Sequence, residues 1–300
     1  MNIIKQLKTA KIVISDLTSH QLNRENKVAA VWRFLKWQIR LRITANPLVH
    51  SFTEKSKLII NKGMPAATGN LYCGLHEYYD MSFLLHFLRP EDLFVDIGAN
   101  IGSYTVLASA HIGAASVSVE PVPSTFTHLI QNININQITG KVTPLNIALG
   151  SQKGDINFTA SYDAANHVAT SDEQNVIKVP VETLDAVMQD QNTPALLKID
   201  VEGFETEVIK GALKTLENDK LKAVIIELNG SGWRYGYNEQ DIHNTFLSMG
   251  FSPYVYNPKE RSLSAKEKLG ASNTIYIRDL NFVKNRVETA PPVTVLGITF

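Results

Sequence analysis

The sequence has little cysteine, no net charge and no long apolar run. Cys73 is the only cysteine among 300 residues, so no disulfide can form within the chain and no cysteine cluster can hold a metal. The 29 basic and 29 acidic residues balance, which does not favour nucleic acid as a partner. No segment approaches the roughly 18 apolar residues of a transmembrane helix, and Met1 to Ser15 does not have the pattern of a signal peptide. We therefore expect a cytoplasmic protein.

The most informative stretch that is present is the run Asp96-Ile97-Gly98-Ala99-Asn100-Ile101-Gly102. An apolar strand leads into it, and a helical pattern leaves from Ser103. Glycine lets the backbone bend and approach a ligand, and the helix N-terminus offers free N–H groups. Asn100 stands where a glycine could be expected, and asparagine tolerates a left-handed backbone. This turn is typical of a site for a nucleotide-like ligand.

Acidic residues around the turn indicate which ligand. Glu120 ends the next strand about twenty residues beyond the glycines, where an acidic side chain accepts hydrogen bonds from ribose hydroxyls. No Lys-Ser or Lys-Thr pair follows Gly102, which argues against a P-loop. Asp96, directly before the turn, suits a ligand with a cationic amino-acid part better than one with a pyrophosphate. The pattern favours S-adenosylmethionine over NAD as the cofactor.

A second motif, Lys198-Ile199-Asp200-Val201-Glu202-Gly203, ends a buried strand about 100 residues later. Ligand chemistry in open α/β sheets lies at such strand ends. With both motifs present in this order, residues from about Leu75 to Asp279 resemble the FkbM family of S-adenosylmethionine-dependent methyltransferases. The resemblance also takes in Gly74-x-x-Glu77, and Leu149-Gly150 before Gly154. The turn and the resemblance together imply which residues bind the cofactor: Glu77, Asp96, Gly98, Ala99, Asn100, Gly102, Ser103, Glu120 and Ala148.

Strand and helix patterns alternate from Asp92 onward. Strands are predicted at about 93–97, 116–120, 143–149, 195–200 and 222–228, with helices at about 102–112, 123–137, 183–190, 205–218 and 239–249. An inserted hairpin is predicted from 155–159 and 176–181, and two final antiparallel strands from 251–256 and 274–278, joined by a polar loop. Repeated strand and helix predict an α/β fold. We expect a doubly wound, mostly parallel seven-stranded sheet of the Rossmann-like class I methyltransferase type.

Methyl transfer to a hydroxyl needs a base, because a sugar or alkyl hydroxyl does not ionise near neutral pH. Asp200 and Glu227 end neighbouring strands, and Glu202 follows closely, so we predict catalytic roles for these three carboxylates. Lys198 faces the same side as Asp200 and could pair with a carboxylate. The same carboxylates could hold a divalent metal, although no histidine spacing supports a transition metal. His76 and His243 are more typical of surface or core histidines than of bases.

An N-terminal helix is predicted at about 23–43, with two apolar stripes on nearly opposite sides. One stripe is Val28, Trp32, Leu35 and Ile39; the other is Ala30, Phe34, Trp37 and Leu41. Two apolar faces need two partners, so we expect a helix packed between the catalytic domain and another element or subunit. The alternative is a membrane-surface helix with aromatic and basic residues at the interface. A homo-oligomer through this helix follows from the first interpretation.

These patterns predict a methyltransferase domain at 75–282, a helical N-terminal extension with its linker at 1–74, and a C-terminal tail at 283–300. We expect O-methylation of a hydroxyl on a sugar or secondary metabolite, with an acceptor pocket made by residues 1–92 and the loop 160–175. Two alternatives stay open at this point. One is a nucleotide-binding module without turnover, and the other is a nicotinamide oxidoreductase on the same topology.

Overall fold

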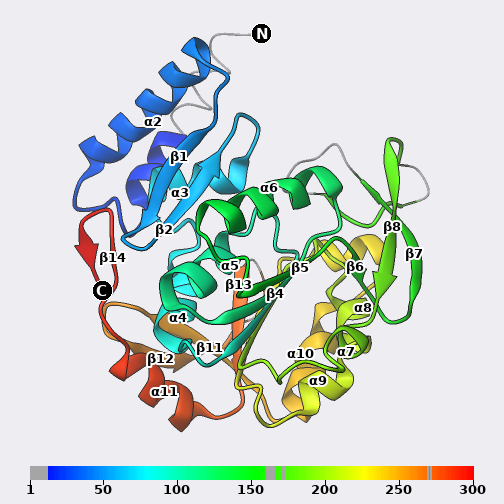
Figure 1. Cartoon of the computed structure of the whole chain (residues 1–300). Helices are drawn as coiled ribbons and strands as arrows, with labels where there is room; N and C mark the ends of the chain where they lie inside the picture. Colours follow the sequence, from blue (N-terminus) through cyan, green and yellow to red (C-terminus); the bar gives the residue numbers. More distant parts are fainter. Residues whose placement is uncertain (1–12, 160–165, 171–172, 269, 271) are drawn as a thin grey trace.

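The computed structural model describes residues 13–159, 166–170, 173–268, 270 and 272–300. Parts of the predicted acceptor loop 160–175, and of the segment before residue 13, lie outside these residues. The chain is built around one eight-stranded sheet of order β12-β11-β13-β10-β9-β3-β4-β5 (Figure 1). Its parallel part comprises β3 (Leu93–Ile97), β4 (Ala115–Val119), β5 (Val142–Leu145), β9 (Leu196–Ile199) and β10 (Ala223–Leu228).

The sheet closes on one side with antiparallel strands. β13 (Ser272–Ile277) lies between β10 and β11 (Ser252–Asn257) and runs antiparallel to both. This order confirms the predicted class I methyltransferase topology. The predicted loop between the last two strands is wrong in part, because it contains an eighth strand, β12 (Ser262–Ala265), paired with the outer edge of β11. The side chain of Asn257 accepts hydrogen bonds from the N–H groups of Lys259 and Glu260, which forms the tight turn between these strands.

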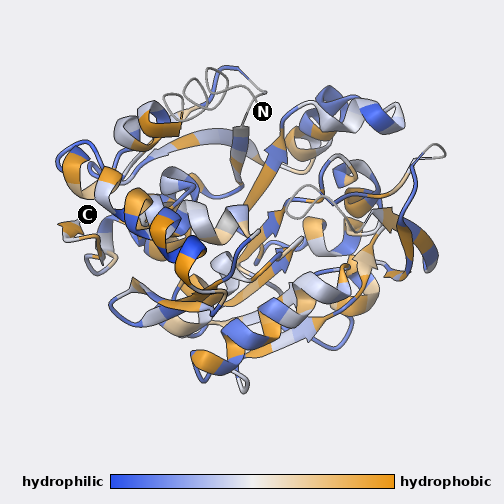
Figure 2. Cartoon of the chain, turned by 90° about the horizontal axis from the view of Figure 1, so that it is seen from above, coloured by the Kyte–Doolittle hydropathy of each residue, from blue (hydrophilic) through white to orange (hydrophobic). Residues whose placement is uncertain are grey.

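Helices cover both faces of the sheet and enclose two separate apolar cores (Figures 1 and 2). The first face is covered by α4 (Tyr78–Phe87), α5 (Ser103–Val106), the π-helix η1 (Leu107–Ile112) and α6 (Pro123–Ile135). The second face is covered by α7 (Leu184–Val187), α8 (Glu205–Lys210), α9 (Leu213–Glu217) and α10 (Glu239–Ser248). α4 and α5 are buried almost all round, whereas the outer helices in Figure 2 alternate between hydrophilic and hydrophobic residues.

The predicted strand at 143–149 divides in two. Its first part is β5, and its second part, β6 (Ala148–Leu149), joins a separate three-stranded sheet with β7 (Gly154–Thr159) and β8 (Val176–Glu182). β7 and β8 pair antiparallel over six residues, which confirms the predicted hairpin. A short 3-10 helix, η3 (Ser231–Tyr235), follows β10.

The N-terminal extension is not purely helical. α2 (Lys27–Ile43) begins after Asn26, whose side chain accepts from the N–H of Ala29. A hairpin of β1 (Leu48–Thr53) and β2 (Ser56–Ile60) and a helix α3 (Pro65–Cys73) follow.

The last residues, which we expected to form a tail, fold as α11 (Leu280–Thr289) and a hairpin of β14 (Thr294–Val295) and β15 (Ile298–Thr299). Val293, Val295 and Phe300 are buried in the first core, so packing holds this segment in place. Among the described residues, no helix is long and apolar enough to cross a membrane.

Candidate active site

The carboxyl ends of neighbouring parallel strands place polar side chains on one face of the sheet. Alternate residues of a strand share a face, so Phe94, Leu196 and Ile225 pack into the first core, and two residues further along each strand the same face carries Asp96, Lys198 and Glu227. Asp96 is directly opposite Lys198 across β3 and β9. The first face is therefore apolar at the start of these strands and ionisable at their carboxyl ends.

The glycine turn after β3 has a left-handed backbone at three positions, with φ of 79° at Gly98, 51° at Asn100 and 87° at Gly102. The N–H groups of Gly98 and Ala99 both donate to the carbonyl of Val119. The next N–H, that of Asn100, donates to Glu120 Oε2 at 3.0 Å. The predicted turn is thus present, and the end of β4 holds it in place.

Gly98 is required by a contact within the chain. A Cβ atom at this position would lie 1.7 Å from the carbonyl oxygen of Asp200, which no side chain permits. The glycine turn and the second motif therefore touch directly at Gly98, although about 100 residues separate them. This contact by itself requires a glycine at position 98.

Asp96 and Glu120 are buried and bound to backbone. Asp96 Oδ2 accepts from the N–H of Thr105 at 3.0 Å and from its hydroxyl at 2.7 Å. Glu120 Oε1 accepts from the N–H of Val122 at 2.9 Å. Burial raises the pKa of Asp96 to about 6 and that of Glu120 to about 7, although these hydrogen bonds oppose the rise.

Lys198, on β9 opposite Asp96, is the cation among these polar side chains. Its Nζ lies 2.6 Å from Asp200 Oδ2 and 4.8 Å from the centre of the Tyr104 ring. Burial disfavours the ammonium charge, but Asp200 and Glu77 outweigh burial and raise the pKa of Lys198 above its ordinary value. Lys198 therefore stays charged in this buried position.

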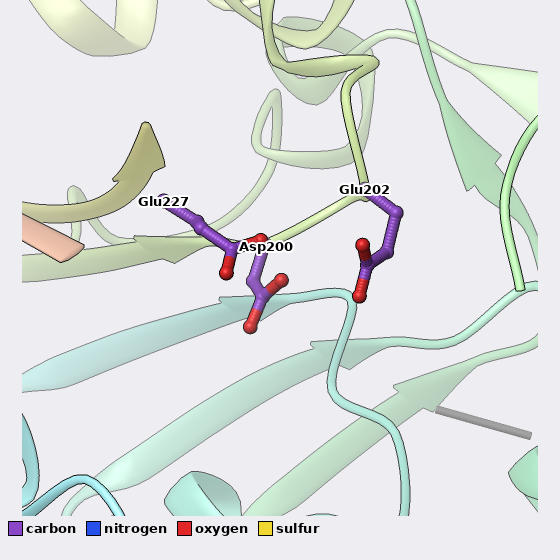
Figure 3. A group of neighbouring side chains, drawn as sticks. All are labelled: Asp200, Glu202 and Glu227. Atoms are coloured by element: carbon purple, nitrogen blue, oxygen red, sulfur yellow. The ribbon is translucent and has the colours of Figure 1, made fainter. Parts of the chain in front are cut away.

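The three predicted catalytic carboxylates converge. Oxygens of Asp200, Glu202 and Glu227 lie within 4.8 Å of one another, and Figure 3 shows Asp200 between the other two. Burial, and then the charges of Asp200 and Glu202, raise the pKa of Glu227 to about 8. Glu227 Oε2 is buried with no hydrogen-bond partner among the described residues. Near neutral pH Glu227 therefore favours its protonated form.

The backbone after Asp200 is unusual, because Glu202 has a φ of 55° and Gly203 a φ of 103°. Glu205 Oε1 accepts from the N–H groups of Val201 and Gly203, at 3.1 and 3.2 Å, and fixes this bend. A Cβ atom on Gly203 would lie 2.7 Å from the carbonyl oxygen of Ser231 in η3. Glu205 thus has a positioning role that the sequence did not indicate, and left-handed backbone at Glu202 is the kind of strain found at functional sites.

α4 places two more carboxyl groups over the sheet. Asn273 on β13, the neighbour of Glu227 in the register, donates to Glu77 Oε1 at 2.7 Å and to Asp80 Oδ2 at 3.1 Å. Burial, and then the charge of Glu77, raise the pKa of Asp80 to about 7. Asp80 has no sequence motif of its own, and only its place one turn after Glu77 could have indicated it.

A cavity of about 410 Å³ joins these groups, within the roughly 300–1,000 Å³ typical of small-molecule sites. The predicted site residues that line it are Glu77, Asp96, Gly98, Ala99, Asn100, Ser103, Glu120, Lys198, Asp200, Glu202 and Glu227. Gly102 and Ala148 do not line it: Gly102 leaves room for Leu129, and Ala148 lines a separate small cavity. The lining residues that were not in the predicted set are Pro65, Asn70, His76, Met81, Tyr104, Pro121, Phe158, Asn166 and Val201.

The two histidines considered as bases differ in position. His76 lines the cavity. Its ring packs closely on Gly69 of α3, because a Cβ atom added to Gly69 would lie only 2.8 Å from the ring. His243 Nδ1 lies 2.9 Å from the hydroxyl of Tyr276 and does not line the cavity.

Comparison with known proteins identifies methyltransferases as relatives of this chain. The Methyltransferase FkbM domain matches residues 96–253, more than half of the chain. The chain is 32% identical over 148 residues to the hexuronic acid methyltransferase AglP of Haloferax volcanii, covering 49% of this chain and 59% of that protein. It is 26% identical over 165 residues to Methyltransferase 1 of Beauveria bassiana, covering 46% of this chain and 66% of that protein. The chain thus spans less than two thirds of the length of either relative.

Among solved structures, methyltransferase FkbM from Methylobacillus flagellatus KT is similar, with a TM-score of 0.45 and 17% identity over 71% of this chain and 55% of that chain. The strand order and the antiparallel β13 define the class I methyltransferase fold. Within that class, the chain belongs to the family of the Methyltransferase FkbM domain.

Proposed function

We propose that the protein transfers a methyl group from S-adenosylmethionine to a hydroxyl oxygen of a sugar or a similar small molecule. One observation carries the proposal: the glycine turn with Glu120, and the carboxylates Asp200, Glu202 and Glu227, line the same cavity. A donor held by the turn and an acceptor held near the carboxylates would therefore meet in one space, as in-line displacement requires.

The charge of the cavity supports a cationic donor. Six carboxyl groups and a single ammonium group, that of Lys198, are among the lining residues; the carboxyls are Glu77, Asp96, Glu120, Asp200, Glu202 and Glu227. A concave site lined mainly by carboxyl groups favours a ligand of positive charge, and a bound cation lowers the raised pKa values of those groups. The sulfonium and amino groups of S-adenosylmethionine are cations, whereas the pyrophosphate of NAD is an anion. In this assignment Glu120 accepts from the ribose hydroxyls, and the turn faces the methionine part.

Asp200 is the base that we propose for the acceptor hydroxyl. It forms an ion pair with Lys198, and it lies beside Glu227, whose raised pKa lets Glu227 take up and release a proton near neutral pH. Glu202 and Glu227 border the same point and would orient the acceptor. A hydroxyl suits this cluster better than an acceptor carboxylate, since three neighbouring carboxyl groups would repel one.

The acceptor class that we place first is a saccharide, since one relative is named as a hexuronic acid methyltransferase. A divalent metal at the three carboxylates is not part of the proposal. Their spacing would suit one, but Lys198 already supplies a cation at Asp200.

The test uses the full chain with methyl-labelled S-adenosylmethionine and a panel of hexuronic acids, hexoses and their glycosides. We expect label to enter a saccharide as an ether that survives mild alkali, with unchanged rates when a chelator is present. Alkali-labile label would identify a methyl ester and replace the hydroxyl with a carboxylate as the acceptor. Loss of activity with a chelator, restored by Mg²⁺, would place a metal at the cluster. Binding of NADH without binding of S-adenosylmethionine would overturn the proposal.

A further inference from the structure

Helix α2 has one buried and one exposed apolar face. Ala30 and Trp37 are buried, and Phe34 and Leu41 pack beside them against the extension and the first core. This is the second of the two predicted stripes, and its packing within the chain is confirmed.

The other stripe has no partner in the described part of the chain. Val28, Trp32, Leu35, Ile39 and Ile43, called here the outer stripe, have exposed fractions of 81%, 52%, 43%, 51% and 77%. At 100° per residue these five side chains fall within one third of the helix circumference. Figure 1 shows α2 at the edge of the molecule, packed on α3 and β1 by one side only. Five adjacent exposed apolar side chains are more than a monomer surface usually carries.

Cations border the outer stripe. α2 contains Lys27, Arg33, Lys36, Arg40 and Arg42 and no acidic residue. No ion pair joins any of these five to a carboxylate of the described residues. On one flank, a cavity of about 330 Å³ is lined by Arg33, Lys36, Trp37, Arg40, Leu48 and Leu71. The exposed surface of this groove is mainly apolar, and Arg33 within it donates hydrogen bonds to Asn23 and to the carbonyl of Tyr72, so Lys36 and Arg40 are the cations that it presents to a ligand.

We infer that the outer stripe and its bordering cations dock on the surface of an anionic lipid bilayer. Apolar residues including Trp32 would enter the headgroup boundary, and Lys36, Arg40 and Arg42 would contact lipid phosphates. Charge decides between a bilayer and a second copy of the chain. Two copies paired along the outer stripe would bring the flanking cations Lys36 and Arg42 of both copies together with no acidic residue of α2 between them, whereas an anionic bilayer complements both these cations and the stripe. The inference is independent of the proposed reaction.

Co-sedimentation with vesicles tests it. The full chain should bind vesicles of phosphatidylcholine and phosphatidylserine, and bind vesicles of phosphatidylcholine alone at least about tenfold more weakly. Trp32→Ala/Ile39→Ala should lower the partition coefficient at least about tenfold, because two inserted side chains are lost. Lys36→Glu/Arg42→Glu should lower it roughly 20-fold or more.

Each double variant has a matched control. Leu247→Ala/Val255→Ala removes two side chains with exposed fractions of 44% and 45% outside α2, and Lys214→Glu/Lys220→Glu makes the same change in net charge outside α2. Both controls should bind as the parent does, and all variants should keep the parent's circular dichroism. Equal binding to both vesicle types, no binding at all, or equal losses in the controls would overturn the inference. So would a dimer, seen by analytical ultracentrifugation, that Trp32→Ala/Ile39→Ala dissociates.

Discussion

Glu120 has two tasks at once, because its oxygens hold the backbone of the turn and also line the cavity. We expect Glu120→Gln to weaken binding of S-adenosylmethionine by roughly 1.5 to 3 kcal/mol, since charge-assisted hydrogen bonds to the ribose become neutral ones. Glutamine keeps one acceptor oxygen for the turn, so the variant should fold. Titration calorimetry measures the effect, with Glu182→Gln at the end of β8 as the control. An unchanged affinity would assign the ribose to another residue.

Asp200 can be tested separately from cofactor binding. Asp200→Asn keeps the size and removes the charge, and it should lower methyl transfer by about 10² to 10⁴ while S-adenosylmethionine affinity stays within about a factor of three. Asp155→Asn, on the exposed edge of β7, is the control for loss of one carboxylate. Full turnover of a folded Asp200→Asn protein would make the Lys198 pair structural and would leave Glu227 as the base.

At the residue scale, the sequence was informative wherever an acidic residue follows an apolar run. Asp96, Asp200 and Glu227 each end such a run, and the carboxyl ends of parallel strands meet at one edge, so their convergence could be predicted. Asn70 and Phe158 could not be predicted, because α3 and β7 reach the cavity only through packing between segments distant in the chain. The reason for Gly98 was also hidden, since the atom that it avoids belongs to Asp200.

Among the elements, α6 connects the N-terminal hairpin to the glycine turn. Asn132 is fully buried; its Oδ1 accepts from the N–H of Ile59 on β2, and its Nδ2 donates to the carbonyl of Ile101 in the turn. One helical turn later, Asn136 binds both backbone groups of Lys57. Residues four apart share a helix face. The amides of Asn132 and Asn136 therefore both reach β2 and provide hydrogen-bond partners for backbone groups on its edge.

We expect Asn132→Ala to lower the free energy of unfolding by about 1 to 3 kcal/mol, because it leaves the partly buried N–H of Ile59 and the buried carbonyl of Ile101 without this partner. Asn134→Ala, on the exposed side of the same helix, should stay within about 0.5 kcal/mol of the parent. Urea denaturation gives both values. Equal effects of the two substitutions would show that helix propensity, rather than the bridge, accounts for the loss.

Element type was predictable where periodicity is strong, as in β3, β4, β9, β10 and α6. The prediction of element type failed for short polar segments. Ser262–Ala265 has no apolar face that would indicate a strand, and it pairs only because β11 offers an open edge. The predicted helix at 102–112 is present, but its second half is a π-helix, which no feature of the side-chain pattern indicated.

Several carboxyl groups across the molecule are buried in environments that favour their protonated form. Burial is the first cause in each case, and the pKa values are raised to about 7 for Asp80, 6 for Asp96, 7 for Glu120, 7 for Glu205 and 8 for Glu227. The unfolded chain releases these protons near pH 4, so above that pH the folded state binds more protons than the unfolded state. Stability from these groups is present at low pH and is lost as pH rises through their folded pKa values.

Two buried histidines act in the opposite direction at lower pH. Burial lowers the pKa of His86 and of His111 to about 4, so they cost stability only as pH falls below about 6.5, where the unfolded chain would be protonated. Between about pH 6.5 and 8 the carboxyl groups therefore dominate. We expect the melting temperature of the cofactor-free protein to fall across this window. Glu205→Gln should flatten the slope, and a melting temperature that is level or rises with pH would contradict the assignment.

The position of β13 affects how the chain can be made. During synthesis β10 and β11 leave the ribosome first, but β13 occupies the place between them. The order of emergence is therefore not the order of pairing, and β10 keeps an open hydrogen-bonding edge until residues 272–277 appear. Asn273, which joins Glu77 and Asp80 over the cavity, arrives with that strand. A nascent chain that ends before β13 has the glycine turn but an unfinished cavity, so the site can be complete only after residues 272–277 have emerged.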